Sequence, residues 1–132
     1  MNILIDTNRY RDLCDGHEGV TKIVQRASRI CMPFIVLAEL RSGFLSGTRA
    51  RANARTLTKF LNSSRTVVLY PDENTVHHYA AAFAQLRKQG TPIPTSDLWI
   101  AALAIQHSLM LLSRDEHFDH FPQIARVSPD QD

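Results

Sequence analysis

The chain has 132 residues, of which 44% are hydrophobic and 21% are charged, a composition typical of a folded domain and not of a disordered chain. Its net charge of +2 by itself excludes no class of partner, but no apolar stretch reaches the ~18 uninterrupted residues of a membrane span. The first ten residues lack the pattern of a secretory signal, so we expect a cytoplasmic protein in which Cys14 and Cys31 are reduced. We expect residues 1–132 to form a single domain.

Strand and helix patterns alternate along the chain. The first half predicts a strand at 2–5, a short helix capped by Thr7 or Asn8, a helix at 19–29, a strand at 30–32, and helices at 34–44 and 48–61. The second half predicts a strand at 66–70, a helix from the N-cap Asp72 to Gly90, a helix at 97–107, and strands at 109–112 and 124–127 before a polar end. Strands that are continuous apolar runs between helices are typical of a parallel sheet covered on both faces, which predicts an α/β fold.

One apolar stripe and one basic stripe can be assigned to helices. The helix after Asp72 is expected to bury Val76, Tyr79, Phe83 and Leu86. Residues 19–71 hold nine Lys and Arg but a single acid, Glu39, a balance of +8. This asymmetry favours a polyanionic partner for one side of the molecule, although a solvated helix face would give the same count.

Aspartates stand at the ends of three predicted elements. Asp6 follows the first strand, Asp97 begins the apolar helix at 97–107, and Asp115 follows the strand at 109–112. That helix climbs roughly 16 Å and the strand returns roughly 13–16 Å, so Asp97 and Asp115 are expected at the same edge. Asp6 belongs to that edge as well, beyond the carboxyl ends of parallel strands where ligands of such sheets bind. Each aspartate taken alone could instead cap the helix or turn that follows it.

The three aspartates, with Glu39 as a further candidate, predict a metal site. Carboxylates gathered at one edge repel one another and hold protons at raised pKa values. A hard divalent cation removes this repulsion, and a set of oxygen ligands suits Mg²⁺ or Mn²⁺. Spacing alone does not force Glu39 into the cluster, but it is flanked by apolar residues and is the one acid of the basic half.

Four segments carry a resemblance to a known family: residues 4–8 (LIDTN), 38–40 (AEL), 96–102 (SDLWIAA) and 113–118 (SRDEHF). In this order they resemble the four acidic motifs of PIN-domain nucleases, above all the toxin half of a VapBC-type toxin–antitoxin pair. The resemblance runs from Ile3 to about Phe118, nearly the whole chain. Each motif alone is weak, whereas four in sequence over a short chain are specific.

The resemblance implies a three-layer α/β/α sandwich with a central, mostly parallel sheet. It implies that Asp6, Glu39, Asp97 and Asp115 ligate Mg²⁺ or Mn²⁺ and are the catalytic residues of an endoribonuclease toxin that hydrolyses RNA phosphodiester bonds. It also implies a homodimer and an antitoxin that blocks the site. Two departures are conservative: Ser96 replaces a common asparagine, and Ser113 replaces a more frequent threonine.

Further residues are candidates for supporting roles. Asn8 and Ser113 are expected to hold a carboxylate or a water in place, unless they serve only as turn residues. The basic residues expected to follow the phosphate backbone of RNA are Arg49, Arg51, Arg55 and Lys59.

Three other interpretations of these residues compete with a PIN-domain nuclease. His117 and His120 with Asp119 lack the cysteines and the closed spacing of a zinc site, so we do not assign one there. A non-catalytic PIN-like module that binds RNA or protein is the main alternative, but it would have no use for the carboxylate cluster. A phosphoacceptor domain with Asp6 or Asp115 as acceptor would need a lysine at a later strand end, and the pattern places none there.

Overall fold

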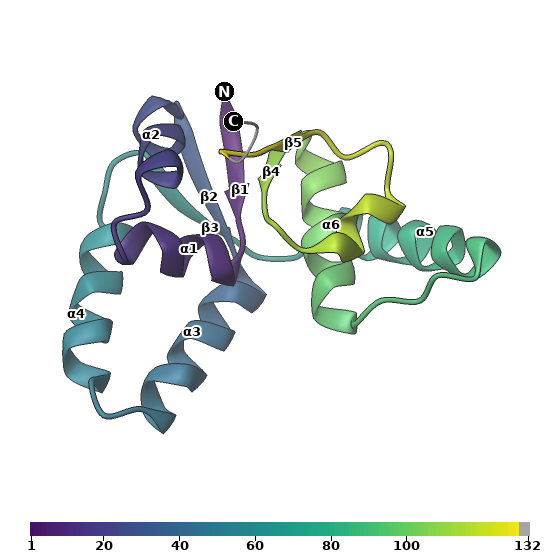
Figure 1. Cartoon of the computed structure of the whole chain (residues 1–132). Coiled ribbons are helices and arrows are strands. Elements are labelled where there is room, and N and C mark those ends of the chain that lie inside the picture. Colours follow the sequence, from purple (N-terminus) through teal and green to yellow (C-terminus); the bar gives the residue numbers. More distant parts are fainter. Residues whose placement is uncertain (130–132) are drawn as a thin grey trace.

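The computed structural model describes residues 1–129, which form a parallel sheet covered by helices (Figure 1). The strands are β1 (Asn2–Ile5), β2 (Arg29–Pro33), β3 (Thr66–Leu69), β4 (Met110–Leu112) and β5 (Arg126–Val127). They pair in the order β3-β2-β1-β4-β5, and each of these pairings is parallel. Leu4 in the central strand β1 is aligned with Cys31 of β2 on one side and with Leu111 of β4 on the other.

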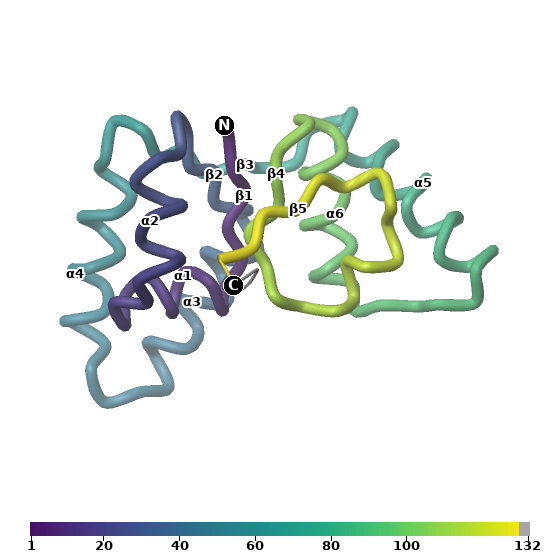
Figure 2. The backbone as a smooth tube through the Cα atoms, turned by 45° about the horizontal axis from the view of Figure 1, so that its top comes forward, coloured from purple at the N-terminus to yellow at the C-terminus, as the bar shows by residue number. Residues whose placement is uncertain are grey.

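The helices form two layers around this sheet. They are α1 (Thr7–Cys14), α2 (Glu18–Arg26), α3 (Phe34–Ser46), α4 (Ala50–Leu61), α5 (Glu73–Gln89) and α6 (Thr95–His107), with a 3₁₀ helix η1 (Glu116–His120) after β4. Figure 1 shows α1, α2 and α4 on one side of the sheet and α5 and α6 on the other, and Figure 2 shows the same division from a second direction. The predicted three-layer α/β/α sandwich is therefore confirmed.

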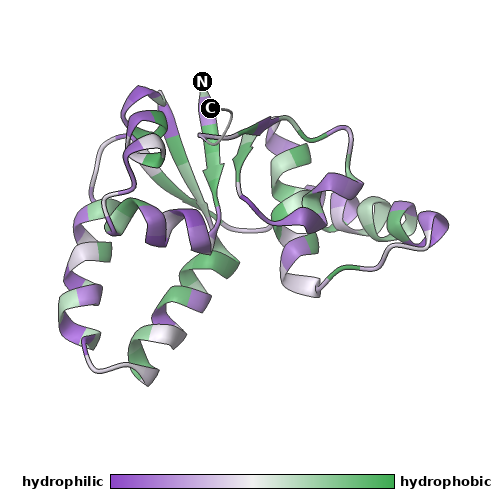
Figure 3. Ribbon diagram, viewed as in Figure 1, coloured by the Kyte–Doolittle hydropathy of each residue, from purple (hydrophilic) through white to green (hydrophobic). Residues whose placement is uncertain are grey.

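The core lies on both faces of the sheet. Ile3, Leu4 and Ile5 of β1 have no exposed surface, and neither do Leu111 and Leu112 of β4. Figure 3 shows the strands in the green of hydrophobic residues, whereas much of α1 has the purple of hydrophilic ones. Each buried Leu or Ile side chain stabilises the fold by about 1.5–3 kcal/mol relative to an exposed one. The packed sheet therefore fixes the positions of the residues at its edge.

Several helix boundaries differ from the predicted ones. The N-cap of α1 is Asp6, not Thr7 or Asn8, and its side chain accepts from the backbone N–H of Arg9. α2 ends at Arg26, because Ala27 is already extended and leads into β2. α6 begins at Thr95, directly after the extended Pro94, so Asp97 lies in the first turn of the helix and is not its N-cap. Part of the expected polar end, residues 130–132, lies outside the described residues.

The buried face of α5 was predicted correctly for Leu86 and Tyr79 and wrongly for Val76 and Phe83. Val76 and Phe83 are 55% and 49% exposed, whereas Thr75 and Ala82 are buried together with Leu86. The hydroxyl of Thr75 donates to the side-chain oxygen of Gln106 in α6, so the buried polar group is satisfied. Both predicted helix ends are correct: Asp72 caps Thr75, and Gly90 ends α5 with a φ of 72°.

Two expectations concern the chain as a whole. No helix within residues 1–129 is both long and apolar enough to cross a membrane. Cys14 is exposed, Cys31 is buried in β2, and both are free thiols.

Candidate functional site

Beyond the carboxyl ends of β1 and β4, the structure has a cleft of about 620 Å³. Its lining includes the four acids singled out in the sequence, Asp6, Glu39, Asp97 and Asp115. They come from the end of β1, from α3, from the first turn of α6 and from the residue that caps η1. The expected convergence of the three aspartates is confirmed, and Glu39 joins them. Their role as ligands remains a prediction.

Asp6 is the most buried of the four acids, with 6% of its surface exposed. One carboxylate oxygen accepts from the backbone N–H of Arg9 at 2.9 Å, and the other accepts from the hydroxyl of Ser113. Burial raises the pKa of Asp6, and the hydrogen bonds from Ser113 and Arg9 act against that rise. Two hydrogen-bond donors therefore stabilise the charged form of Asp6, which burial destabilises.

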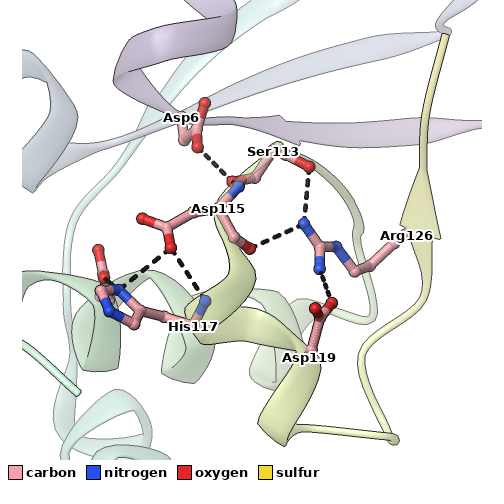
Figure 4. A network of polar contacts seen from close by, with 7 residues as sticks. Asp6, Ser113, Asp115, His117, Asp119 and Arg126 are labelled. Atoms are coloured by element: carbon pink, nitrogen blue, oxygen red, sulfur yellow. Dashed lines mark hydrogen bonds and ion pairs between the residues drawn. The ribbon is translucent and has the colours of Figure 1, made fainter. Parts of the chain in front are cut away.

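Ser113 links two of the acids (Figure 4). Its hydroxyl donates to Asp6 and accepts from the backbone N–H of Asp115 at 3.1 Å. The supporting position predicted for Ser113 thus has a structural basis. Asn8, the other supporting candidate, is exposed and lines the cleft.

A histidine that the sequence analysis set aside lies among the acids. The Nδ1 of His117 is 2.6 Å from an oxygen of Asp97 and 3.1 Å from an oxygen of Asp115. The hydrogen bond with Asp97 raises the pKa of His117, while burial raises the pKa of Asp97. His117 follows Asp115 by two residues within a predicted turn. This short spacing is the sequence signal that could have placed it here.

The capping alternative is also partly correct. Asp6 caps α1, and Asp115 caps η1 by accepting from the backbone N–H of His117 at 2.9 Å. Asp97 has no such role, because α6 begins after Pro94 and no side chain caps it. Capping and clustering are therefore compatible: the caps fix how two of the carboxylates face the cleft.

Arg126 of β5 holds the loop that carries Asp115 (Figure 4). Its guanidinium donates to the carbonyl oxygen of Ser113 at 2.7 Å and to that of Asp115 at 3.1 Å, and it pairs with the carboxylate of Asp119. Asp119 is thus bound to Arg126, whereas His117 turns towards the acids. Nothing in the local pattern around Arg126 indicated this role, because its partners precede it by up to 13 residues.

The side of the cleft near α3 has its own contacts. The hydroxyl of Thr7 donates to a carboxylate oxygen of Glu39 at 2.9 Å. Arg11 lines the cleft and also a neighbouring groove of about 440 Å³, which includes Arg49 and Asn53 of α4. Thr7 and Arg11 are residues that the sequence analysis missed.

The four basic residues assigned to RNA do not share one face. Arg49 lines the groove beside Arg11, whereas Arg51 lines a different hollow with Arg41; Phe44 of α3 lines both. Arg55 and Lys59 are exposed and follow Arg51 at intervals of four residues, so they lie on the side of α4 nearer to Arg51. Only Arg49 among the four lines a groove that adjoins the acidic cleft.

The donor set fits a divalent cation. Four carboxylates line one cleft, and burial raises the pKa of both Asp6 and Asp97. Ligand atoms of Asp97, Asp115 and His117 all lie within 4.8 Å of one another. Carboxylate oxygens are the preferred ligands of Mg²⁺ and are accepted by Mn²⁺.

Comparison with known proteins gives a consistent family. The PIN domain matches residues 3–124. The chain is 36% identical over 121 residues to "Ribonuclease VapC1" of Haemophilus influenzae strain R2866, covering 87% of each chain. It is 31% identical over 94 residues to "Ribonuclease VapC4" of Mycobacterium tuberculosis, covering 71% of this chain and 72% of that one.

Solved structures agree with the sequence relatives. A chain in the structure of VapBC-1 from nontypeable Haemophilus influenzae superposes with a TM-score of 0.85 at 28% identity, over 98% of both chains. The family match spans nearly all of this chain, and the fold and the order of the four acidic segments agree with it. The chain therefore belongs to the PIN domain family.

Proposed function

We propose that this protein is an endoribonuclease that depends on Mg²⁺ or Mn²⁺ and acts in the cytoplasm as the toxin of a toxin–antitoxin pair. The observation that carries the proposal is the cleft in which Asp6, Glu39, Asp97 and Asp115 meet. The similarity to relatives named ribonuclease VapC supports RNA as the substrate. The similarity to a VapBC-1 structure supports a cognate antitoxin as the partner.

In this proposal the four acids hold the metal. A bound divalent ion would polarise the scissile phosphate and activate a water for attack on it. Ser113 orients Asp6 and Asp115, and Thr7 orients Glu39. Arg11 and Arg49, along the cleft and the adjoining groove, would bind neighbouring phosphates of the RNA, which gives affinity more than sequence preference.

The assembly remains part of the proposal. We propose one domain over residues 1–132 and a homodimer. The exposed Phe83 lines an apolar hollow with Pro92, Ile93 and Leu98, between α5 and the start of α6. Exposed apolar surface of this kind favours association.

The phosphoacceptor alternative loses support at this site. The described residues that line the acidic cleft include Arg11 but no lysine. The remaining alternative, a module that binds RNA without cutting it, differs from the enzyme in a single measurable property, cleavage.

The test is incubation of total RNA with the purified protein in Mg²⁺, in Mn²⁺ and in EDTA. We expect cleavage with either metal, loss of cleavage in EDTA, and loss in Asp97→Asn. Glu73→Gln is the matched control, because Glu73 is an acid in the first turn of α5, as Asp97 is in the first turn of α6, but it is exposed and does not line the cleft. RNA binding without cleavage under every metal would refute the enzyme and favour the binding module.

A further inference from the structure

His117, on η1, contacts two of the acids that line the cleft and supplies a donor atom of a different kind. Its Nδ1 lies 2.6 Å from Asp97 and 3.1 Å from Asp115, and Figure 4 shows the ring beside the Asp115 carboxylate. The three ligand atoms lie within 4.8 Å of one another, close enough for one ion to contact all three. This group of candidate ligand atoms therefore contains one imidazole nitrogen and two carboxylate oxygens.

The position of the ring is set by the loop that carries it. The backbone N–H of His117 donates to the same oxygen of Asp115 that faces its Nδ1. The next residue, Phe118, is 1% exposed and anchors η1 in the core. Arg126 binds the carbonyl oxygens of Ser113 and Asp115 just before the turn. The backbone that bears the ring is therefore held on both sides.

The spacing of the donors fits neighbouring ligands of one ion. Adjacent ligands of an octahedral ion with bonds of about 2.1 Å are roughly 3 Å apart. The 3.1 Å between Nδ1 and Asp115 already has this spacing, and the 2.6 Å to Asp97 would open by a few tenths of an ångström. Imidazole binds metal ions through either ring nitrogen, Nδ1 included.

We propose that the Nδ1 of His117 is a metal ligand, alongside Asp97 and Asp115, in the metal centre of this nuclease. The inference rests on the proposed function, because it assigns a further ligand to the same centre. It gives the centre a mixed set of nitrogen and oxygen donors.

This donor set has a consequence for the choice of metal. Imidazole suits transition metals, whereas Mg²⁺ keeps to oxygen ligands and water. The protein should therefore bind Mn²⁺ and Co²⁺ more tightly than a centre of carboxylates alone would. Removing the imidazole should weaken Mn²⁺ and Co²⁺ binding about tenfold or more and leave Mg²⁺ binding little changed.

The competing explanation is that His117 is only a counter-ion for the bare carboxylates. Its side chain is 43% exposed, so the ring has room to leave when a cation arrives. In that case its removal would leave Mn²⁺ affinity unchanged or raise it. The two explanations thus predict opposite effects of one substitution.

The test is pulsed electron paramagnetic resonance of the full chain loaded with Mn²⁺, which detects a directly bound imidazole nitrogen. We expect the nitrogen modulation in the wild type and in His120→Ala, and its loss in His117→Ala. His120 is the matched control, because it lies on the same 3₁₀ helix but does not belong to the group of ligand atoms that His117 forms with Asp97 and Asp115. Calorimetric titration with Mn²⁺ and Mg²⁺ gives the affinities, and circular dichroism verifies the fold of each variant.

Each outcome has a distinct meaning. Bound Mn²⁺ without nitrogen modulation, or with modulation that persists in His117→Ala, would overturn the ligand and leave the carboxylate centre in place. No binding of Mn²⁺ by the wild type would overturn the metal centre of the proposed function together with the ligand. Loss of the modulation in His117→Ala alone, with weaker Mn²⁺ binding, would establish His117 as a ligand.

Discussion

The guanidinium of Arg126 donates a hydrogen bond of 3.1 Å to the carbonyl oxygen of Asp115, so a residue of the two-residue edge strand β5 supports the far end of the acidic cleft. The same group binds the carbonyl oxygen of Ser113 at 2.7 Å. These bonds tie the loop between β4 and η1 to the sheet. β5 adds little to the core, and its contribution lies in positioning this loop.

Arg126→Ala should weaken metal binding without unfolding the protein. Hydrogen bonds from a charged donor are worth about 1.5–3 kcal/mol, and part of that energy holds Asp115 in place. We expect roughly a tenfold loss of Mn²⁺ affinity by calorimetry, together with a lower free energy of unfolding in urea. Asp119→Asn is the control, because it removes the ion pair of Arg126 and leaves both carbonyl bonds. Equal losses in the two variants would show that the ion pair, and not the carbonyl bonds, matters.

Ser113→Ala should weaken metal binding by a different route. It removes the hydroxyl that donates to Asp6 and accepts from the backbone N–H of Asp115. The pKa of Asp6 should then rise further, because a donor that lowers it is lost. We expect about a tenfold to a hundredfold loss of Mn²⁺ affinity at neutral pH, whereas Ser113→Thr keeps the hydroxyl and should stay near the wild type. A threonine variant as weak as the alanine variant would count against this explanation.

The layers of the fold and the meeting of the aspartates could be predicted from the sequence because they depend on short-range properties. Apolar runs fix which segments are strands, and the lengths of a helix and the strand after it decide where Asp97 and Asp115 finish. The buried face of α5 could not be predicted in this way. The buried hydroxyl of Thr75 bonds both its cap Asp72 and Gln106, 31 residues away, and a local hydrophobic pattern contains no trace of the distant partner.

The polar contacts of the site also divide into those that local motifs predict and those that depend on residues far apart in the sequence. The four acids were recognised from motifs, but the roles of His117 and Arg126 depend on contacts between segments. The division of the basic residues was also missed, since a count of charges along α4 does not show which side of the helix adjoins the cleft. Arg49 is the N-cap of α4 and Arg51 lies within the helix, and the two line different hollows.

The ionisation of the buried Asp6 should lower the free energy of unfolding of the metal-free protein, so its contribution to stability is greatest at acid pH. The pKa of this carboxyl in the fold is above the 3.8 of the free side chain, because the group is buried. Between these two values the folded state binds more protons than the unfolded state, so stability falls as pH rises through that window and stays lower above it. Asp6→Asn removes this dependence and still offers an oxygen to cap α1.

We therefore expect Asp6→Asn to be more stable than the wild type at pH 7 in EDTA, by about 1 kcal/mol or more. The difference should shrink as pH falls towards 4. Urea denaturation from pH 4 to pH 8 gives the comparison. Parallel curves for the two proteins over this whole range would contradict the assignment of the pH dependence to Asp6.

Arg49→Ala should weaken RNA binding more than Arg51→Ala does. Both residues are exposed, at the start of α4, but Arg49 lines the groove that continues into the acidic cleft through Arg11, whereas Arg51 lines a hollow with Arg41. Each phosphate contact to single-stranded RNA adds about 0.7 to the slope of log affinity against log salt concentration. With Asp97→Asn, which we expect not to cleave RNA, as background, filter binding at several salt concentrations should show a smaller slope for Arg49→Ala and an unchanged slope for Arg51→Ala. Equally reduced slopes for both variants would mean that RNA contacts both residues and follows the whole basic surface of α4. A slope reduced only for Arg51→Ala would place the RNA path along the hollow that Arg51 lines.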